Sequence, residues 1–179
     1  MLSTTQGLSR EFAYGTLAHE FVHMIQFASD RNEGSWLGEG FAELGFFLNG
    51  YKMDDKPWLY ASDPDLQLTT WEKENSLPHY GASFLYLAYF LDRFGKEATQ
   101  ALITDPENDI TSVDDTLAKL GVTDPLTGRI VTADDVFMDW SAALYLLDGT
   151  VGDGRYTYHN NPDAPQTDDT EAISCPQST

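Results

Sequence analysis

A five-residue pattern near the start of the chain constrains its fold and chemistry more than any other feature. His19 and His23 lie four positions apart in the stretch His19-Glu20-Phe21-Val22-His23. On an α-helix, side chains at i and i+4 share a face, so both imidazoles can point at one ion. Glu20 follows His19 directly and can reach a water molecule on that ion without being a ligand. The pattern therefore predicts a zinc-binding helix, with Glu20 as the general base of a metal-assisted hydrolysis.

A further metal ligand is expected outside this helix, because a catalytic zinc ion normally takes three protein ligands and keeps a fourth position for water. Two downstream carboxylates qualify, Glu39 and Glu43, which are one helical turn apart. We predict a second helix over 36–48, capped by Ser35, that presents both on one face. If Glu39 binds the ion, Glu43 can accept a hydrogen bond from the far ring nitrogen of a histidine ligand, which fixes its tautomer.

The remaining sequence predicts a mainly α-helical protein. The first helix is expected to run from a cap at Ser9 to about Ala28. Residues 51–78 show neither the helical nor the strand periodicity of apolar residues. Further helices are predicted at 79–94, 96–104, 112–120 (capped by Ser112) and 133–147 (capped by Thr132), with a short strand at 155–158. We divide the chain into metal-binding helices at 1–50, a long active-site loop at 51–78, a helical subdomain at 79–148 and an extended tail or further module at 149–179.

The charge balance restricts the partners of the protein. Acidic residues outnumber basic ones by 29 to 10, giving a net charge of −19, which argues against nucleic acid and anionic membranes as partners. The longest apolar run, 84–91, is far shorter than the roughly 20 residues that span a bilayer. Excess carboxylates suit an extracellular setting and could hold calcium, although a solvated surface is the preferred interpretation. The single cysteine, Cys175, cannot form a disulfide within the chain.

Taken together, the two motifs resemble those of a known group of peptidases. The first, His19-Glu20-Phe21-Val22-His23, is followed by Trp36-Leu37-Gly38-Glu39-Gly40-Phe41-Ala42-Glu43. This pair is similar to the gluzincin metallopeptidases, and most similar to secreted bacterial neutral proteases of the hyicolysin type and to immune-inhibitor-A-like proteins. The second motif of that family is commonly W-L-N-E-G-F-A, so Gly38 replaces the usual asparagine. Metzincins fit poorly, because Gln26 and Ser29 occupy positions where their motif requires glycine and histidine.

The resemblance implies a fold, a site and a substrate class. The fold would be a zincin-like catalytic portion whose usual N-terminal β-sheet lobe is largely missing from these residues. Glu39 would be the third zinc ligand, and Glu43 would orient the first histidine. The substrate would be a protein or peptide, cleaved outside a bacterial cell.

Gluzincins also place a tyrosine or histidine near the developing oxyanion. Tyr80 is the preferred candidate, ahead of His79, and His159 is a weaker alternative. Tyr80 could instead be an aromatic residue of the core, and His79 and His159 could be structural histidines. The predicted function is that of a zinc metalloendopeptidase. An aminopeptidase of the same type and a catalytically inactive protease-like binding module remain open alternatives, and the sequence leaves the oligomeric state undetermined.

Overall fold

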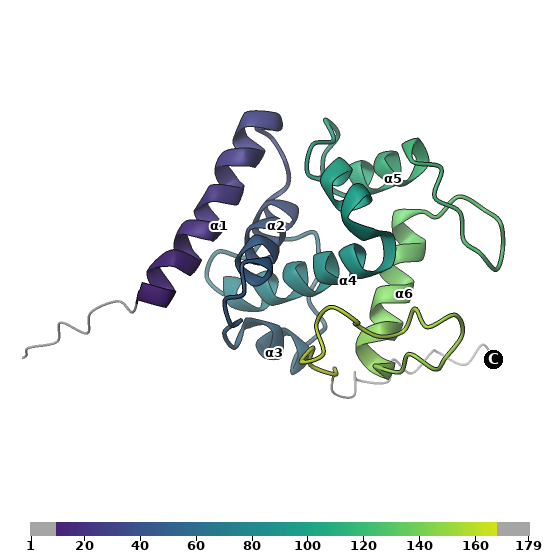
Figure 1. Cartoon of the computed structure of the whole chain (residues 1–179). Coiled ribbons are helices and arrows are strands. Elements are labelled where there is room, and N and C mark those ends of the chain that lie inside the picture. Colours follow the sequence, from purple (N-terminus) through teal and green to yellow (C-terminus); the bar gives the residue numbers. More distant parts are fainter. Residues whose placement is uncertain (1–9, 168–179) are drawn as a thin grey trace, which may run out of the picture.

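The computed structural model describes residues 10–167, and this part of the chain is mainly helical (Figure 1). Its helices are α1 (Arg10–Ser29), α2 (Ser35–Leu48), α3 (Lys56–Ala61), α4 (Ser76–Leu102), α5 (Asp109–Lys119) and α6 (Ala133–Leu146). Within the described residues there is no strand, only an isolated bridge between Thr123 and Ile130. The mainly α prediction is therefore confirmed. The strand predicted at 155–158 is wrong, because Gly152 and Gly154 adopt positive φ and turn the chain there.

Helix α4 lies at the centre of the structure (Figure 1). Residues 81–90 are all buried, since α2, α3, α5 and α6 all pack against this helix. Tyr86 packs edge-to-face against two tryptophans, Trp36 of α2 and Trp140 of α6, with ring centres 5.4 and 5.5 Å away. Gly95 has φ 79°, which interrupts α4 where the sequence predicts the end of one helix and the start of the next.

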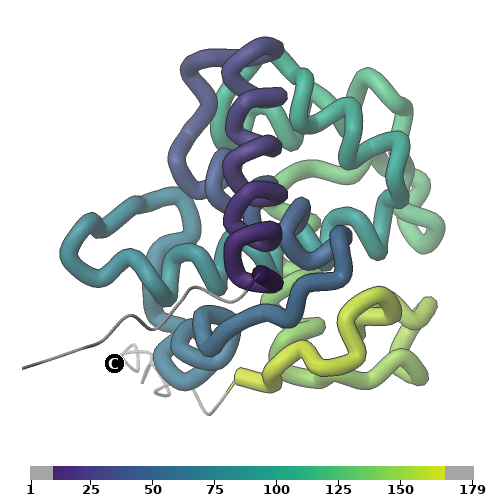
Figure 2. Tube along the Cα trace, turned by 60° about the vertical axis from the view of Figure 1, so that its left-hand side comes forward, coloured from purple at the N-terminus to yellow at the C-terminus, as the bar shows by residue number. Residues whose placement is uncertain are grey.

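Helix α1 lies at the side of the molecule and packs chiefly on α2 (Figures 1 and 2). Small residues bring the two helices close together. A Cβ atom on Gly45 would lie 2.4 Å from the Val22 side chain, and one on Gly15 would lie 2.3 Å from the Phe46 ring. The predicted end of this helix near Ala28 is confirmed within one residue, whereas its predicted cap, Ser9, lies outside the described residues.

The predicted helix caps have different outcomes. Thr132 caps α6 as predicted, and its hydroxyl and the Asp135 side chain form a reciprocal capping box. Ser35 is instead the first residue of α2, after Gly34. Ser112 lies inside α5, because that helix begins at Asp109.

The segment 51–78 was predicted to be a long loop. It contains helix α3, and its last residues, from Ser76 on, already belong to α4. The loop prediction is wrong at these positions, because α3 is stabilised by packing on α4 and has too few residues to show a period. The close approach of α3 to α4 depends on Gly81, where a Cβ atom would lie 2.1 Å from the carbonyl oxygen of Lys56. This contact holds Lys56 near the start of α4.

Residues 148–167 pack over α4 and α6 (Figure 2). The buried Tyr158 hydroxyl donates to the carbonyl of Leu85 (3.1 Å) and accepts from the Trp140 indole (2.9 Å). This part of the predicted tail is thus integrated into the helical core, while residues 168–179, including Cys175, lie outside the described residues. Among the described helices, none has the length and apolarity needed to cross a membrane.

Candidate metal centre

Three predicted ligands converge between α1 and α2. The Nε2 atoms of His19 and His23 lie 3.2 Å apart, and each is 3.3 Å from Oε2 of Glu39. The histidines reach this point because i and i+4 share the face of α1 that packs on α2. Within residues 10–167, no other group of three His, Cys, Asp or Glu side chains comes together in this way.

The spacing of these three atoms fits a tetrahedral metal ion. Zinc bonds of about 2.0–2.1 Å to nitrogen or oxygen place neighbouring ligand atoms roughly 3.3 Å apart. The three distances between His19, His23 and Glu39 agree with that edge length. The same geometry suits other divalent ions that take imidazole and carboxylate ligands, so these three residues could hold a metal ion, and the geometry does not select zinc.

Both imidazole rings are held in the orientation that metal binding requires. Nδ1 of His19 faces Oε1 of Glu43 at 3.4 Å, and Nδ1 of His23 faces Oε1 of Gln26 at 3.3 Å. If each Nδ1–H donates to its acceptor, both Nε2 atoms present lone pairs toward Glu39. Gln26 has the same role for His23 as Glu43 for His19. Gln26 was not predicted as a partner of His23; its signal in the sequence is a polar residue three positions after His23, on the same side of the helix.

The ligands favour positive charge at their meeting point. Burial lowers the pKa of His19, but the carboxylates of Glu39 and Glu43 beside its ring outweigh burial and raise it to about 9. Burial raises the pKa of Glu39, yet the two histidines 3.3 Å from its Oε2 outweigh burial and lower it to about 2. Oε2 of Glu39 is buried and has no conventional hydrogen-bond donor in the described part of the chain. A bound cation would satisfy this oxygen and both nitrogens at once.

Lys56 of α3 completes the surroundings of Glu43. Its Nζ lies 2.8 Å from Oε1 of Glu43, the oxygen that faces His19, and 5.0 Å from the ring centre of Tyr80. The buried Glu43 carboxylate is therefore charge-compensated, which holds it in place beside His19. Lys56 was also missed in the sequence, because it lies in a segment without periodicity and only the packing of Gly81 brings it here.

Glu20 and Tyr80 lie near the candidate ligands. Glu20 is exposed on α1, next to His19, and the Tyr80 ring centre is 6.4 Å from the His19 ring centre. Burial is the largest cause that raises the pKa of Tyr80 to about 12, and the charges of Glu39, Glu43 and Glu20 act in the same direction. Tyr80 therefore keeps its proton at neutral pH and can donate a hydrogen bond.

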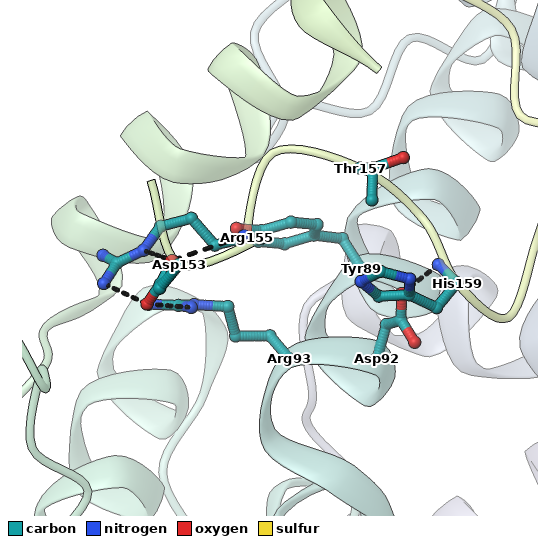
Figure 3. A pocket seen from close by; sticks show the side chains of 8 residues that line it. Tyr89, Asp92, Arg93, Asp153, Arg155, Thr157 and His159 are labelled. Carbon is teal, nitrogen blue, oxygen red and sulfur yellow. Dashed lines mark hydrogen bonds and ion pairs between the residues drawn. The ribbon is translucent and has the colours of Figure 1, made fainter. Parts of the chain in front are cut away.

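The two other histidines have different surroundings. His79 is buried, and its ring contact in the described residues is with Trp71, with centres 5.6 Å apart. His159 lies beside Asp92, whose carboxylate accepts its backbone N–H, and lines a cavity of about 170 Å³ (Figure 3). Asp92 is twelve residues along α4 from Tyr80, a rise of about 18 Å. His159 is thus not brought to the candidate metal centre, and within residues 10–167 no hydrogen bond, ion pair or ring contact joins His79 to His19, His23 or Glu39.

The cavity beside His159 contains an ion-pair network and no group of converging ligands (Figure 3). Arg155 pairs with Asp124, Asp139 and Asp153 at 2.7–2.9 Å, and Arg93 lies close to the same carboxylates. Hydrogen bonds to Arg155 lower the pKa of Asp124 and Asp153 to about 2. These aspartates are engaged by arginines, and calcium binding by this acidic chain stays a prediction.

Comparison with models of known protein families gives no match, and no curated protein is significantly similar to the chain. The functional assignment therefore depends on the ligand geometry. Three side chains from two helices converge with the spacing of metal ligands, and each histidine has an acceptor at its far nitrogen. The chain carries a candidate metal centre at the α1–α2 interface.

Proposed function

We propose that this protein is a zinc-dependent metalloendopeptidase of the gluzincin type, with a zincin-like catalytic portion. The observation that carries the proposal is the triangle formed by His19, His23 and Glu39. The site is open to solvent, since the side chains of His23 and Glu39 are 32% and 25% exposed. A catalytic zinc site needs this access for water and substrate, whereas structural sites are closed.

The neighbouring residues supply the other groups that peptide hydrolysis requires. A bound zinc ion would polarise the scissile carbonyl and lower the pKa of its water to about 7. Glu20 would take the proton of the attacking water and pass it to the leaving amine. Tyr80, protonated at neutral pH, donates to the carbonyl oxygen as negative charge develops on it. Glu43 holds His19 in position, and Lys56 compensates the charge of Glu43.

The substrate and location of the enzyme follow from the same proposal. We propose an extracellular bacterial protease that acts on proteins or peptides. The net charge of −19 suits that setting. The aminopeptidase and the inactive binding module remain alternatives, and the inactive module is disfavoured because Glu20 and all three ligands are present.

Replacing the base tests the mechanism. Glu20→Gln should leave zinc bound at one ion per chain and lower the cleavage of a denatured protein by about 10²- to 10⁴-fold. Glu11→Gln changes another exposed acid on the same helix and should leave both quantities unchanged. Metal content is measured by atomic absorption and cleavage by mass spectrometry.

Three results would contradict the proposal. Full activity in Glu20→Gln would exclude Glu20 as the base. Stoichiometric zinc in the unmodified chain without cleavage of any unfolded protein would favour the inactive binding module. Loss of zinc in His19→Ala together with unchanged cleavage would exclude the metal from the reaction.

A further inference from the structure

One carboxylate oxygen behind the candidate metal centre is shared by two partners. Oε1 of Glu43 faces Nδ1 of His19 at 3.4 Å and accepts a hydrogen bond from Nζ of Lys56 at 2.8 Å. The Glu43 side chain is only 4% exposed, so solvent screens these contacts weakly. The contact with Lys56 is the shorter one and joins two charged groups, so it takes part of the charge that Glu43 otherwise offers to His19.

The ammonium group of Lys56 is fixed at this oxygen. The backbone carbonyl of Lys56 lies against Gly81 of α4, and its Nζ is 5.0 Å from the ring centre of Tyr80, within the range of a cation–π contact. Burial lowers the pKa of Lys56, but the carboxylates of Glu43 and Asp54 outweigh burial and raise it. Asp54 lies 3.2 Å from Nζ, yet its side chain is 60% exposed and therefore well screened by water. Lys56 is thus a permanent cation directed chiefly at Glu43.

The two histidine ligands differ in the groups behind them. Nδ1 of His23 faces the neutral amide oxygen of Gln26, whereas Nδ1 of His19 faces a carboxylate. A carboxylate in this position makes a histidine more basic and strengthens its bond to a metal ion. By engaging that carboxylate, Lys56 brings the acceptor of His19 closer in strength to the neutral acceptor of His23.

The charge balance around the ligands points the same way. Glu39 and Glu43 contribute two negative charges, and Lys56 offsets one of them. A divalent ion bound by these residues would keep a net positive charge, whereas without Lys56 the two carboxylates would neutralise it. Net positive charge polarises a carbonyl group and lowers the pKa of a bound water molecule.

We infer that Lys56 is a positioning residue that acts through Glu43 to limit the electron donation of His19, which weakens metal binding but keeps the ion strongly polarising. The inference rests on the proposed peptidase function. It assigns opposite roles to two neighbouring side chains, because Glu43 strengthens the bond between His19 and the metal and Lys56 moderates that effect.

The first test measures zinc affinity without substrate, by competition with a chromophoric chelator. Lys56→Met keeps the length of the side chain, removes its charge and should tighten zinc binding by about 10-fold. Glu43→Gln should weaken binding by about 10- to 100-fold, because His19 loses its charged acceptor. Lys52→Met is the matched control, since it removes an exposed lysine of the same segment, and it should leave the affinity unchanged.

Two further variants test the route of the effect. If Lys56 acts through Glu43, the double variant Lys56→Met, Glu43→Gln should bind zinc within about twofold of Glu43→Gln alone. Lys56→Gln keeps a hydrogen-bond donor without the charge and should also tighten binding, and it decides the matter if circular dichroism shows that Lys56→Met is unfolded. A purely structural role of Lys56 predicts the opposite sign, with weaker binding in Lys56→Met and normal binding in Lys56→Gln, and would overturn the inference.

Cleavage of a peptide at saturating zinc separates this inference from the proposed function. Lys56→Met should lower kcat by about 10-fold and change KM little, because Lys56 acts on the ion and not on the bound peptide. An undiminished kcat, or zinc binding that is not tightened in either Lys56 variant, overturns this inference alone. Zinc binding by the unmodified chain without any cleavage overturns the proposed function and leaves the affinities to decide the role of Lys56, whereas absence of zinc binding overturns both.

Discussion

Helices α1 and α4 are both rich in large apolar side chains, yet their surroundings are opposite. In α4, every side chain from 81 to 90 is buried, because four other helices pack around it. In α1, which packs chiefly on α2, six large apolar side chains are more than half exposed: Phe12, Tyr14, Leu17, Phe21, Met24 and Phe27. Apolar composition alone therefore does not determine which helix forms the core.

The comparison indicates that different interactions hold the two helices. Burial of apolar area stabilises α4, at roughly 25 cal/mol per Å². Helix α1 is held by a narrow interface, where Val22 packs on Gly45 and where His19 and His23 meet Glu39. The candidate metal centre is thus part of the contact that docks α1, and metal binding and helix docking should be coupled.

The largest expected effect is on the free energy of unfolding, when a buried phenylalanine is replaced and compared with an exposed one. Phe84→Ala in α4 should lower the free energy of unfolding by about 3–5 kcal/mol, because it removes a fully buried ring and leaves a cavity. Phe21→Ala in α1 should change it by no more than about 0.5 kcal/mol, because that ring is 60% exposed. Denaturant unfolding followed by circular dichroism gives both values. Similar losses in the two variants would mean that the outer face of α1 is covered in solution.

Metal addition should stabilise α1 selectively. At a zinc concentration a hundred times the dissociation constant, binding adds about 2.7 kcal/mol to folded-state stability. Hydrogen exchange should slow mainly in α1 and α2, since the ligands join these helices, and should change little in the middle of α4. The double variant His19→Ala, His23→Ala should show neither effect. Uniform slowing across all helices would indicate that α1 is no less stably docked than α4.

Local sequence patterns were sufficient to predict which side chains meet in the candidate metal centre and where several helices begin or end. The i, i+4 spacing of His19 and His23 specifies a shared helix face whatever packs nearby, and Thr132 with Asp135 forms a cap within four residues. Interactions between residues three or four positions apart depend little on the rest of the fold. The mutual arrangement of the ligands follows from two such helices packing together, and the pairing of α1 with α2 was not predictable from either motif alone.

Features that depend on distant contacts were missed. Helix α5 begins before Ser112 because the carboxylate of Glu33, 76 residues from Asp109, accepts the Asp109 N–H. Lys56 reaches Glu43 only because α3 packs on α4 at Gly81. The tail predicted from residue 149 onward is anchored by Tyr158 through hydrogen bonds to Leu85 and Trp140. None of these partners is close in sequence, so no local pattern could indicate them.

The smallest expected effect is the change in stability when one glycine in each helix is replaced by alanine. Gly81→Ala in α4 should destabilise the protein by about 1–3 kcal/mol, because the new methyl group would meet the rigid backbone of Lys56 at 2.1 Å and force α3 away. Gly15→Ala in α1 meets only the ring of Phe46, which is partly exposed and can turn, and alanine favours the helix by up to about 1 kcal/mol. This variant should therefore be neutral or slightly stabilising in thermal unfolding. A loss in Gly15→Ala as large as in Gly81→Ala would mean that the α1–α2 interface is as rigid as the α3–α4 interface, and the contrast between a loosely docked helix and a core helix would not hold.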